Sequence, residues 1–105
     1  MKEIFEKCTG FQWDNGNSNK SLLKHNVTNP ECEQVFFNQP IIVANDLNHS
    51  IEEDSWFLLG GTDQDRFLFV VFTIREELVR VISARDMNKK EREIYNEEIK
   101  KNSQV

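Results

Sequence analysis

Cysteine, proline and glycine are all scarce in this 105-residue sequence, which has two cysteines, two prolines and four glycines. Two cysteines are too few for a disulfide scaffold, and Cys8 and Cys32 lack the spacing of a metal-binding pair. No apolar run is long enough to cross a bilayer, and the first ten residues carry acidic side chains where a secretory signal would have an apolar core. The sequence predicts a cytoplasmic protein with free thiols and without a metal, a cofactor or a membrane segment.

The motifs of several enzyme classes are also missing. There is no glycine-rich phosphate loop, no H-E-x-x-H and no G-x-S-x-G, so the sequence does not support a P-loop enzyme, a metalloprotease or a hydrolase built on a nucleophile elbow. Hydrophobic residues make up 38% of the chain and include eight phenylalanines, enough for one core. We predict a single domain over residues 1–105, with residues 1–10 as a lead-in and 102–105 as a frayed tail.

The chain does contain one strongly β-forming and positively charged stretch, from Arg66 to Arg92. Residues 66–74 are almost wholly β-branched or aromatic, residues 75–77 have turn character, and residues 78–84 resume the β pattern, which predicts a hairpin. The stretch has seven positive and four negative side chains, a net charge of +3 in a chain of −5, so the remaining residues carry −8.

The other elements follow from caps, turns and apolar patterns. Asn15 or Asn17 could cap a helix over residues 18–25 that carries Leu22 and Leu23 on one side, and Asn26 suits its left-handed end. We expect a strand at 11–13, helices at 18–25, 28–38 and 89–101, and strands at 41–44, 55–59, 66–74 and 78–84. The predicted class is α+β with the order β-α-α-β-β-β-β-α.

The strand over residues 66–74 is apolar on both sides. Phe67, Phe69 and Val71 alternate with Leu68, Val70 and Phe72, so both faces of the sheet need cover. The two N-terminal helices can cover one face, whereas the last helix has only a narrow apolar stripe to offer the other. We therefore expect a partner chain to complete the cover, because large exposed apolar patches are rare on soluble monomers.

Basic and imidazole side chains are the main candidates for chemistry. They are Lys24 and His25 at a helix end, His49 in an acidic loop, and Arg66, Arg75, Arg80 and Arg85 on or beside strands. Metal-free RNA cleavage needs a base, an acid and fixed positive charge, and this set can supply all three. Ordinary structural roles remain open, since Lys24 and His25 also suit a helix C-terminus and His49 can be solvated.

The motifs resemble those of the BrnT toxin family across residues 11–98. The shared features are Trp13-Asp14, Lys24-His25 with Val27, Val35-Phe36 before Pro40, His49-Ser50 with Glu53, Gly60, Ile82 to Arg85, Glu91-Arg92 and Tyr95. The resemblance implies a RelE-like fold, an antiparallel sheet of four to five strands with two N-terminal helices and a C-terminal helix. It also implies a ribonuclease that arrests translation, with a BrnA-like ribbon-helix-helix antitoxin that binds operator DNA and neutralises the toxin.

Residues and resemblance together assign the candidate site. The predicted catalytic residues are Lys24, His25, His49, Glu53 and Arg80, and the predicted RNA or phosphate contacts are Arg66, Arg75, Arg85, Lys89 and Lys90. Operator DNA is expected to be contacted only through the antitoxin complex, and a dimer or heterotetramer is possible.

Four positions depart from the family pattern. Asn17 stands where the family has Lys, Ser21 where it has Asn, Asn26 where it has Gly, and Ser55 where an Arg is expected after Glu53. Loss of a fixed cation can raise the barrier to reaction by about two to four kcal/mol. The alternative prediction is therefore a toxin-like binding module that cleaves weakly and acts with its antitoxin as a repressor.

Overall fold

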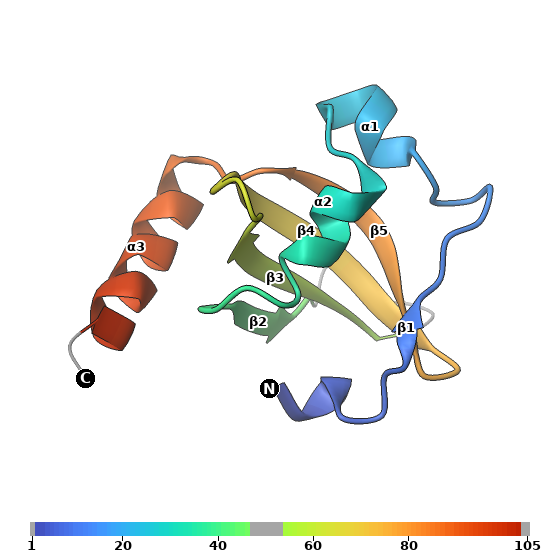
Figure 1. Ribbon diagram of the computed structural model, residues 1–105, viewed down its shortest axis with the longest axis horizontal. Coiled ribbons are helices and arrows are strands. Elements are labelled where there is room, and N and C mark those ends of the chain that lie inside the picture. The colour runs from blue at the N-terminus through green and yellow to red at the C-terminus, as the bar shows by residue number, and fades with distance from the viewer. Residues whose placement is uncertain (1, 47–53, 104–105) are drawn as a thin grey trace.

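A five-stranded sheet forms the centre of the computed structural model, which describes residues 2–46 and 54–103 (Figure 1). The elements in chain order are η1 (Lys2–Phe5), β1 (Gly10–Phe11), α1 (Lys20–His25), α2 (Asn29–Gln34), β2 (Ile42–Asn45), β3 (Ser55–Gly61), β4 (Phe67–Arg75), β5 (Leu78–Asp86) and α3 (Lys89–Ser103). This confirms the predicted α+β class and the order β-α-α-β-β-β-β-α. The first ten residues also hold the short 3₁₀ helix η1, which the sequence left undecided.

The strands lie in the order β1-β5-β4-β3-β2. The four strands from β2 to β5 pair in antiparallel fashion, as predicted, whereas the two-residue β1 runs parallel to β5 and makes the sheet mixed. A bulge interrupts the β4–β5 pairing, because Val71 lies opposite Ser83 while Phe72 lies opposite Val81. Ile82 is the extra residue, and it reverses the alternation of faces along β5.

The bulge decides which residues of β5 face the core. Val79, Val81 and Ala84 are all buried in the same apolar cluster, which strict alternation would not allow. Arg80 and Arg85 consequently lie on the opposite face. The phenyl rings of Phe5 and Phe36 pack on Phe72 from the core side, with ring centres 5.6 and 5.1 Å away.

The helix caps follow local sequence chemistry. Asn26 ends α1 with φ of 58°, and Thr28 and Glu31 form a reciprocal capping box at the start of α2. Asn88 and Glu91 exchange the same pair of hydrogen bonds at α3. The left-handed end at Asn26 was predicted, whereas α2 ends at Gln34, earlier than expected.

The predicted start of α1 is wrong. The helix begins at Lys20, after a left-handed Asn19. The backbone carbonyl of Asp14 accepts the N–H groups of Asn17 and Ser18 and holds those two residues in a turn, so they are not part of the helix. Leu22 and Leu23 do not pack inward and are 37% and 89% exposed. The helix attaches instead through Ser21, whose buried hydroxyl accepts the Ala84 N–H at 2.8 Å.

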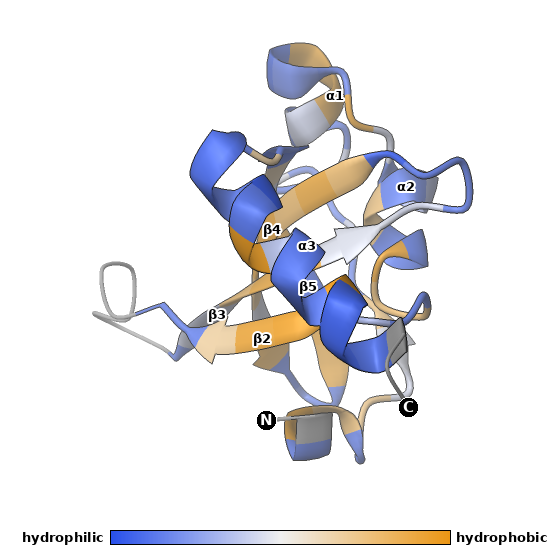
Figure 2. Ribbon diagram, turned by 90° about the vertical axis from the view of Figure 1, so that its left-hand side faces the viewer, coloured by the Kyte–Doolittle hydropathy of each residue, from blue (hydrophilic) through white to orange (hydrophobic). Residues whose placement is uncertain are grey.

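Helix α3 covers part of the second face of the sheet. Its buried Tyr95 contacts Phe67 at 5.7 Å between ring centres and donates its hydroxyl to the Pro40 carbonyl at 2.6 Å. Figure 2 shows the largely hydrophilic α3 lying in front of the apolar strands. Leu59 and Val71 are buried on this face within the single chain, so their burial needs no partner, and the expectation of a covering chain stays a prediction.

Two predictions about the whole chain can be examined directly. Among the residues that the structure describes, no helix combines the length and apolar character needed to cross a bilayer. Cys8 and Cys32 are both free thiols, as expected, and burial raises the pKa of the Cys32 thiol to about 12.

Candidate functional site

The structure separates the predicted site residues into two groups at opposite ends of β5. One end, called the Asp86 end, holds Lys24, His25, Arg66, Arg85, Lys89 and Lys90. The other end, called the Arg75 end, holds Arg75 and Arg80. At about 3.3 Å per residue, Arg80 and Asp86 lie roughly 15 to 20 Å apart along the strand, so one phosphate group cannot contact both ends.

Arg66 ties three elements together at the Asp86 end. Its guanidinium donates to both Asp86 carboxylate oxygens at 2.7 and 3.1 Å and to Glu31 at 3.2 Å. It also donates to the backbone carbonyls of His25 and Asn26 at the end of α1. The hydrogen bonds with Asp86 raise the pKa of Arg66 and lower the pKa of Asp86. These contacts indicate a structural role, while the predicted phosphate contact of Arg66 stays a prediction.

Lys24 and His25 form the last turn of α1 beside this network. Lys24 is exposed and His25 is half-buried. The Arg66 hydrogen bond is the largest cause of the lowered Asp86 pKa, and the nearby charge of His25 adds to it. His25 is therefore an imidazole with a carboxylate in its surroundings. Lys89 and Lys90 add two exposed cations at the start of α3.

Arg85 points to the opposite face of the sheet from Asp86. Its guanidinium makes a two-point contact with Glu91 at 2.8 and 2.9 Å and lies 4.2 Å above the ring centre of Phe69. The bond with Glu91 raises the pKa of Arg85. Because Glu91 also accepts the Asn88 N–H, Arg85 helps to fix the start of α3 on the sheet.

Arg80 is the most enclosed of the arginines in ion pairs at the candidate site, with a side chain only 13% exposed. Its two terminal nitrogens donate to the Asp14 carboxylate at 2.7 and 3.0 Å. The hydrogen bond from Arg80 is the main reason that the pKa of Asp14 is lowered, and the charge of Arg75 adds to the effect. Arg80 is thus a guanidinium held in one orientation, which is the form of positive charge that stabilises an anion without reorganisation.

The loop that carries Asp14 is fastened to β5 by the buried Asn17. The Asn17 amide donates to the carbonyls of Gln12 and Val81, both at 3.0 Å, and its oxygen accepts the Asp14 N–H at 2.8 Å. Gly16 lies so close that a Cβ there would be 2.8 Å from the Arg80 guanidinium. Sequence reasoning treated these residues as a turn and missed their contact with Arg80, although Trp13-Asp14 was part of the resemblance.

Ser55, where the resemblance predicts an arginine, lies in the same row of the sheet as Arg80. Ser55 pairs with Thr73, which in turn pairs with Arg80. At about 4.8 Å per strand, the Ser55 and Arg80 backbones are roughly 10 Å apart. Ser55 is buried, and the Thr73 hydroxyl donates to the Asp54 carbonyl at 2.6 Å. An arginine at position 55 would have added charge to this row.

His49 and Glu53 fall in residues 47–53, outside the described residues. The described residues on either side of them belong to the Arg75 end, since the Asp46 N–H donates to the Ser55 carbonyl at 2.8 Å. Whether His49 and Glu53 join Arg80 therefore stays a prediction.

Comparison with protein families identifies the family of this chain. Residues 13–91 match a family described as the ribonuclease toxin, BrnT, of type II toxin-antitoxin systems. This chain belongs to the BrnT family. No match to it was found among curated proteins. The BrnT match begins at Trp13, ends at Glu91 and so contains both ends of β5, which confirms the resemblance read from the sequence. Membership in a type II toxin family also implies an antitoxin partner.

Proposed function

We propose that this chain is a metal-independent endoribonuclease that arrests translation. The observation that carries the proposal is the BrnT match over residues 13–91, because it spans both basic groups described above. In such cleavage the 2′-hydroxyl of RNA attacks the adjacent phosphate. The reaction needs a base for the hydroxyl proton, an acid for the leaving 5′-oxygen and positive charge near the phosphorus.

The described geometry supports a division of roles between the two ends. His25, beside the Asp86 carboxylate, transfers protons, and the exposed Lys24, Lys89 and Lys90 attract phosphate at the Asp86 end. Arg80 and Arg75 hold a second phosphate of the same RNA strand at the Arg75 end. Because base and acid must act on one phosphate, Lys24 is the acid that accompanies His25 at the Asp86 end. On the sequence alone, His49 and Glu53 form the other candidate pair, at the phosphate held by Arg80. An RNA segment of several nucleotides, running along β5, would reach both ends.

A second candidate function has a specific observation in its favour. Arg66, Arg80 and Arg85 all form ion pairs with carboxylates of the same chain, and Ser55 replaces an expected cation. Phosphate must compete with these carboxylates. The chain would then cleave weakly and act mainly through a BrnA-like ribbon-helix-helix antitoxin, as a dimer or heterotetramer that contacts operator DNA through the antitoxin.

Induced expression in cells that lack the antitoxin distinguishes the two functions. A ribonuclease toxin is expected to stop growth and amino-acid incorporation, and the purified protein should cut RNA in the presence of EDTA. Normal growth with a soluble, folded product would exclude the first function and support the second. Cleavage that EDTA abolishes would contradict metal independence.

Single substitutions then test the assigned residues. We expect His25→Ala to reduce the cleavage rate while RNA binding persists, and Arg80→Ala to weaken RNA binding as well as cleavage. His49→Ala tests the group assigned from the sequence, and Lys101→Ala on the exposed last turn of α3 is the matched control. Unchanged cleavage in all three variants would refute the proposed site.

A further inference from the structure

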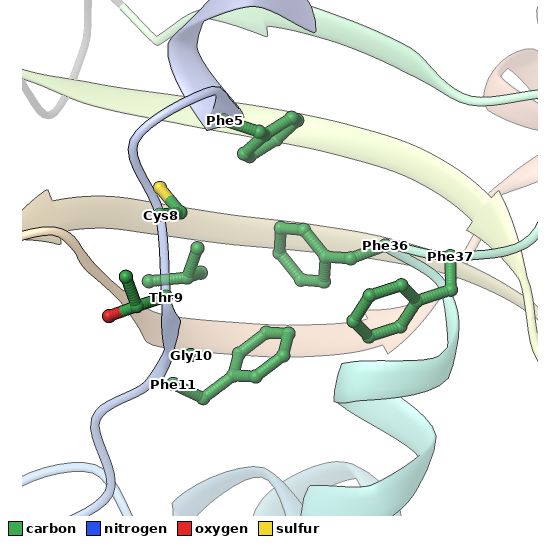
Figure 3. A pocket seen from close by; sticks show the side chains of 8 residues that line it. Phe5, Cys8, Thr9, Gly10, Phe11, Phe36 and Phe37 are labelled. Atoms are coloured by element: carbon green, nitrogen blue, oxygen red, sulfur yellow. The ribbon is translucent and has the colours of Figure 1, made fainter.

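An aromatic hollow lies on the core side of the sheet, near the β4–β5 turn. It has a volume of about 260 Å³, and Figure 3 shows phenylalanine rings from η1, β1 and the segment after α2 converging on it. Its apolar lining includes Phe5, Cys8, Phe11, Phe36, Phe37 and Val79. The hollow is separate from the proposed RNA contacts, because Val79 and Arg80 point to opposite faces of β5, and Lys24 and His25 lie at the other, Asp86 end of that strand.

Phe37 is the most unusual residue of this surface. Its side chain is 74% exposed, although its ring centre lies 6.1 Å from that of Phe11. Phe37 also lines a second hollow of about 500 Å³ that extends past Asp63 and Asp65 toward Tyr95. A large aromatic ring that lines two adjoining hollows is typical of a contact that a partner buries.

The surroundings of the hollow are acidic. The segments around it carry Glu3, Glu6, Glu76 and Glu77 against Lys2, Lys7 and Arg75, and the second hollow adds the exposed Asp63 and Asp65. The Glu77 carbonyl accepts the Thr9 N–H at 2.8 Å, which places the β4–β5 turn directly beside the lining. A partner with positive charge around an apolar anchor is complementary to this surface.

The turn itself gives an independent reason to assign it a function. Glu76 and Glu77 both have positive φ, of 51° and 68°, in the two-residue connection between Arg75 and Leu78. Such a turn favours Asn-Gly, and glutamate there is strained. Strained residues concentrate at functional sites, and these two carboxylates occupy a turn in which Asn-Gly would be less strained.

We propose that the aromatic hollow and the Glu76–Glu77 turn form the docking site for the antitoxin. The partner segment carries an apolar side chain that enters the hollow beside Phe37, with lysine or arginine residues that face Glu76, Glu77, Asp63 and Asp65. This inference rests on the proposal that the chain works with an antitoxin. It adds the surface and the chemistry of the segment that binds there.

The first test measures the affinity of the antitoxin encoded beside this chain for purified variants. Phe37→Ser should weaken binding by about 10- to 100-fold and leave RNA cleavage and growth arrest unchanged. Leu23→Ser is the matched control, because Leu23 is an apolar residue, 89% exposed, on α1. Equal binding by Phe37→Ser and the wild type would overturn the docking site while the antitoxin proposal stands. Failure of the wild-type chain to bind the antitoxin would overturn both.

The second test separates binding from folding. The double variant Glu76→Asn with Glu77→Gly relieves the strained turn and removes two charges, so it should unfold at a higher urea concentration and yet bind the antitoxin more weakly. Its binding should also depend less on salt. A more stable variant with unchanged affinity would exclude the acidic turn from the docking site.

Light scattering of the chain alone tests a second copy as the occupant. A wild-type mass that Phe37→Ser does not change supports the antitoxin as the occupant. A wild-type dimer that becomes a monomer in Phe37→Ser, with antitoxin binding unchanged, would overturn the proposal by making the surface a self-association interface.

Discussion

Arg66 and Arg80 are both held by carboxylates, but they serve the molecule differently. Arg66 bonds to α1 carbonyls, to Glu31 and to Asp86 with its side chain 26% exposed, whereas Arg80 bonds to Asp14 on a loop. We expect Arg66→Met to lower the free energy of unfolding by about 2 kcal/mol, because carboxylates and carbonyls lose charged donors. Urea unfolding measures this, with the exposed Lys90→Met as control. Equal stability of Arg66→Met and Lys90→Met would show that Arg66 is not a structural link.

Gly60 is a second residue with a structural role, because the packing around it leaves no room for a side chain. A Cβ at this buried position would lie 3.0 Å from the Val35 carbonyl oxygen and 3.2 Å from the Val35 Cβ. Gly60→Ala must therefore push the end of α2 away from β3, and we expect a loss of about 1 to 3 kcal/mol in the free energy of unfolding. In the control Gly10→Ala the nearest atom is at 3.7 Å, so its urea midpoint should stay close to wild type. A Gly60→Ala midpoint like that of the control would contradict this packing.

At the residue scale, the sequence identified which charged side chains matter but not what they contact. Arg80 was one of the predicted catalytic residues. Its partner Asp14 lies 66 positions away in the sequence, and only the folding of the loop by Asn17 brings the two together. Such long-range contacts depend on tertiary packing, which local patterns do not encode.

At the scale of elements, Tyr95 holds the middle of α3 to the sheet, while the Arg85–Glu91 contact holds its start. Burial raises the pKa of this phenol, and its hydroxyl donates to Pro40. Because the folded pKa exceeds the unfolded value of about 10, the contribution is present below pH 10 and lost as pH rises through the folded pKa. We expect alkaline unfolding to be coupled to tyrosinate formation. Tyr95 is the only tyrosine, so ultraviolet absorbance reports its ionisation directly.

The matching variant is Tyr95→Phe. It loses the hydrogen bond, which lowers stability at neutral pH by about 1 kcal/mol, but it also loses the ionisable group. Its stability should therefore fall less steeply than wild type above pH 10 in urea titrations followed by circular dichroism. Tyrosinate that forms at its ordinary pKa, before any unfolding of the wild type, would show that α3 does not bury this side chain.

The ends of helices could be predicted from neighbouring residues, whereas irregularities within strands could not, because they depend on tertiary packing. The start of α2 after Thr28 and the left-handed Asn26 depend on neighbouring residues, and both were predicted. The bulge at Ile82 was not, because two apolar residues in succession fit either face of a strand. Without that bulge Arg80 and Ala84 would share a face, so the placement of Arg80 opposite the buried Ala84 depends on a feature that the strand pattern conceals.

At the scale of the whole molecule, charge is divided between surfaces. The stretch from Arg66 to Arg92 carries +3 and the rest −8, and the aromatic hollow lies in acidic surroundings on the other side of the sheet from Arg80. The division suits two partners of opposite charge, RNA at the basic groups along β5 and a basic protein segment at the aromatic hollow. It also limits nonspecific binding of nucleic acid, because the molecule as a whole repels phosphate.

The salt dependence of RNA binding tests this division. A single-stranded RNA with 2′-O-methyl groups in place of the attacking hydroxyls allows binding to be measured without cleavage. With about three phosphate contacts, the slope of log K against log salt should be about −2, since each contact contributes about −0.7. Arg80→Ala should make the slope shallower by about 0.7, whereas Arg66→Met, which loses internal bonds, should leave it unchanged. If Arg66→Met changed the slope and Arg80→Ala did not, RNA would bind at the Asp86 end alone.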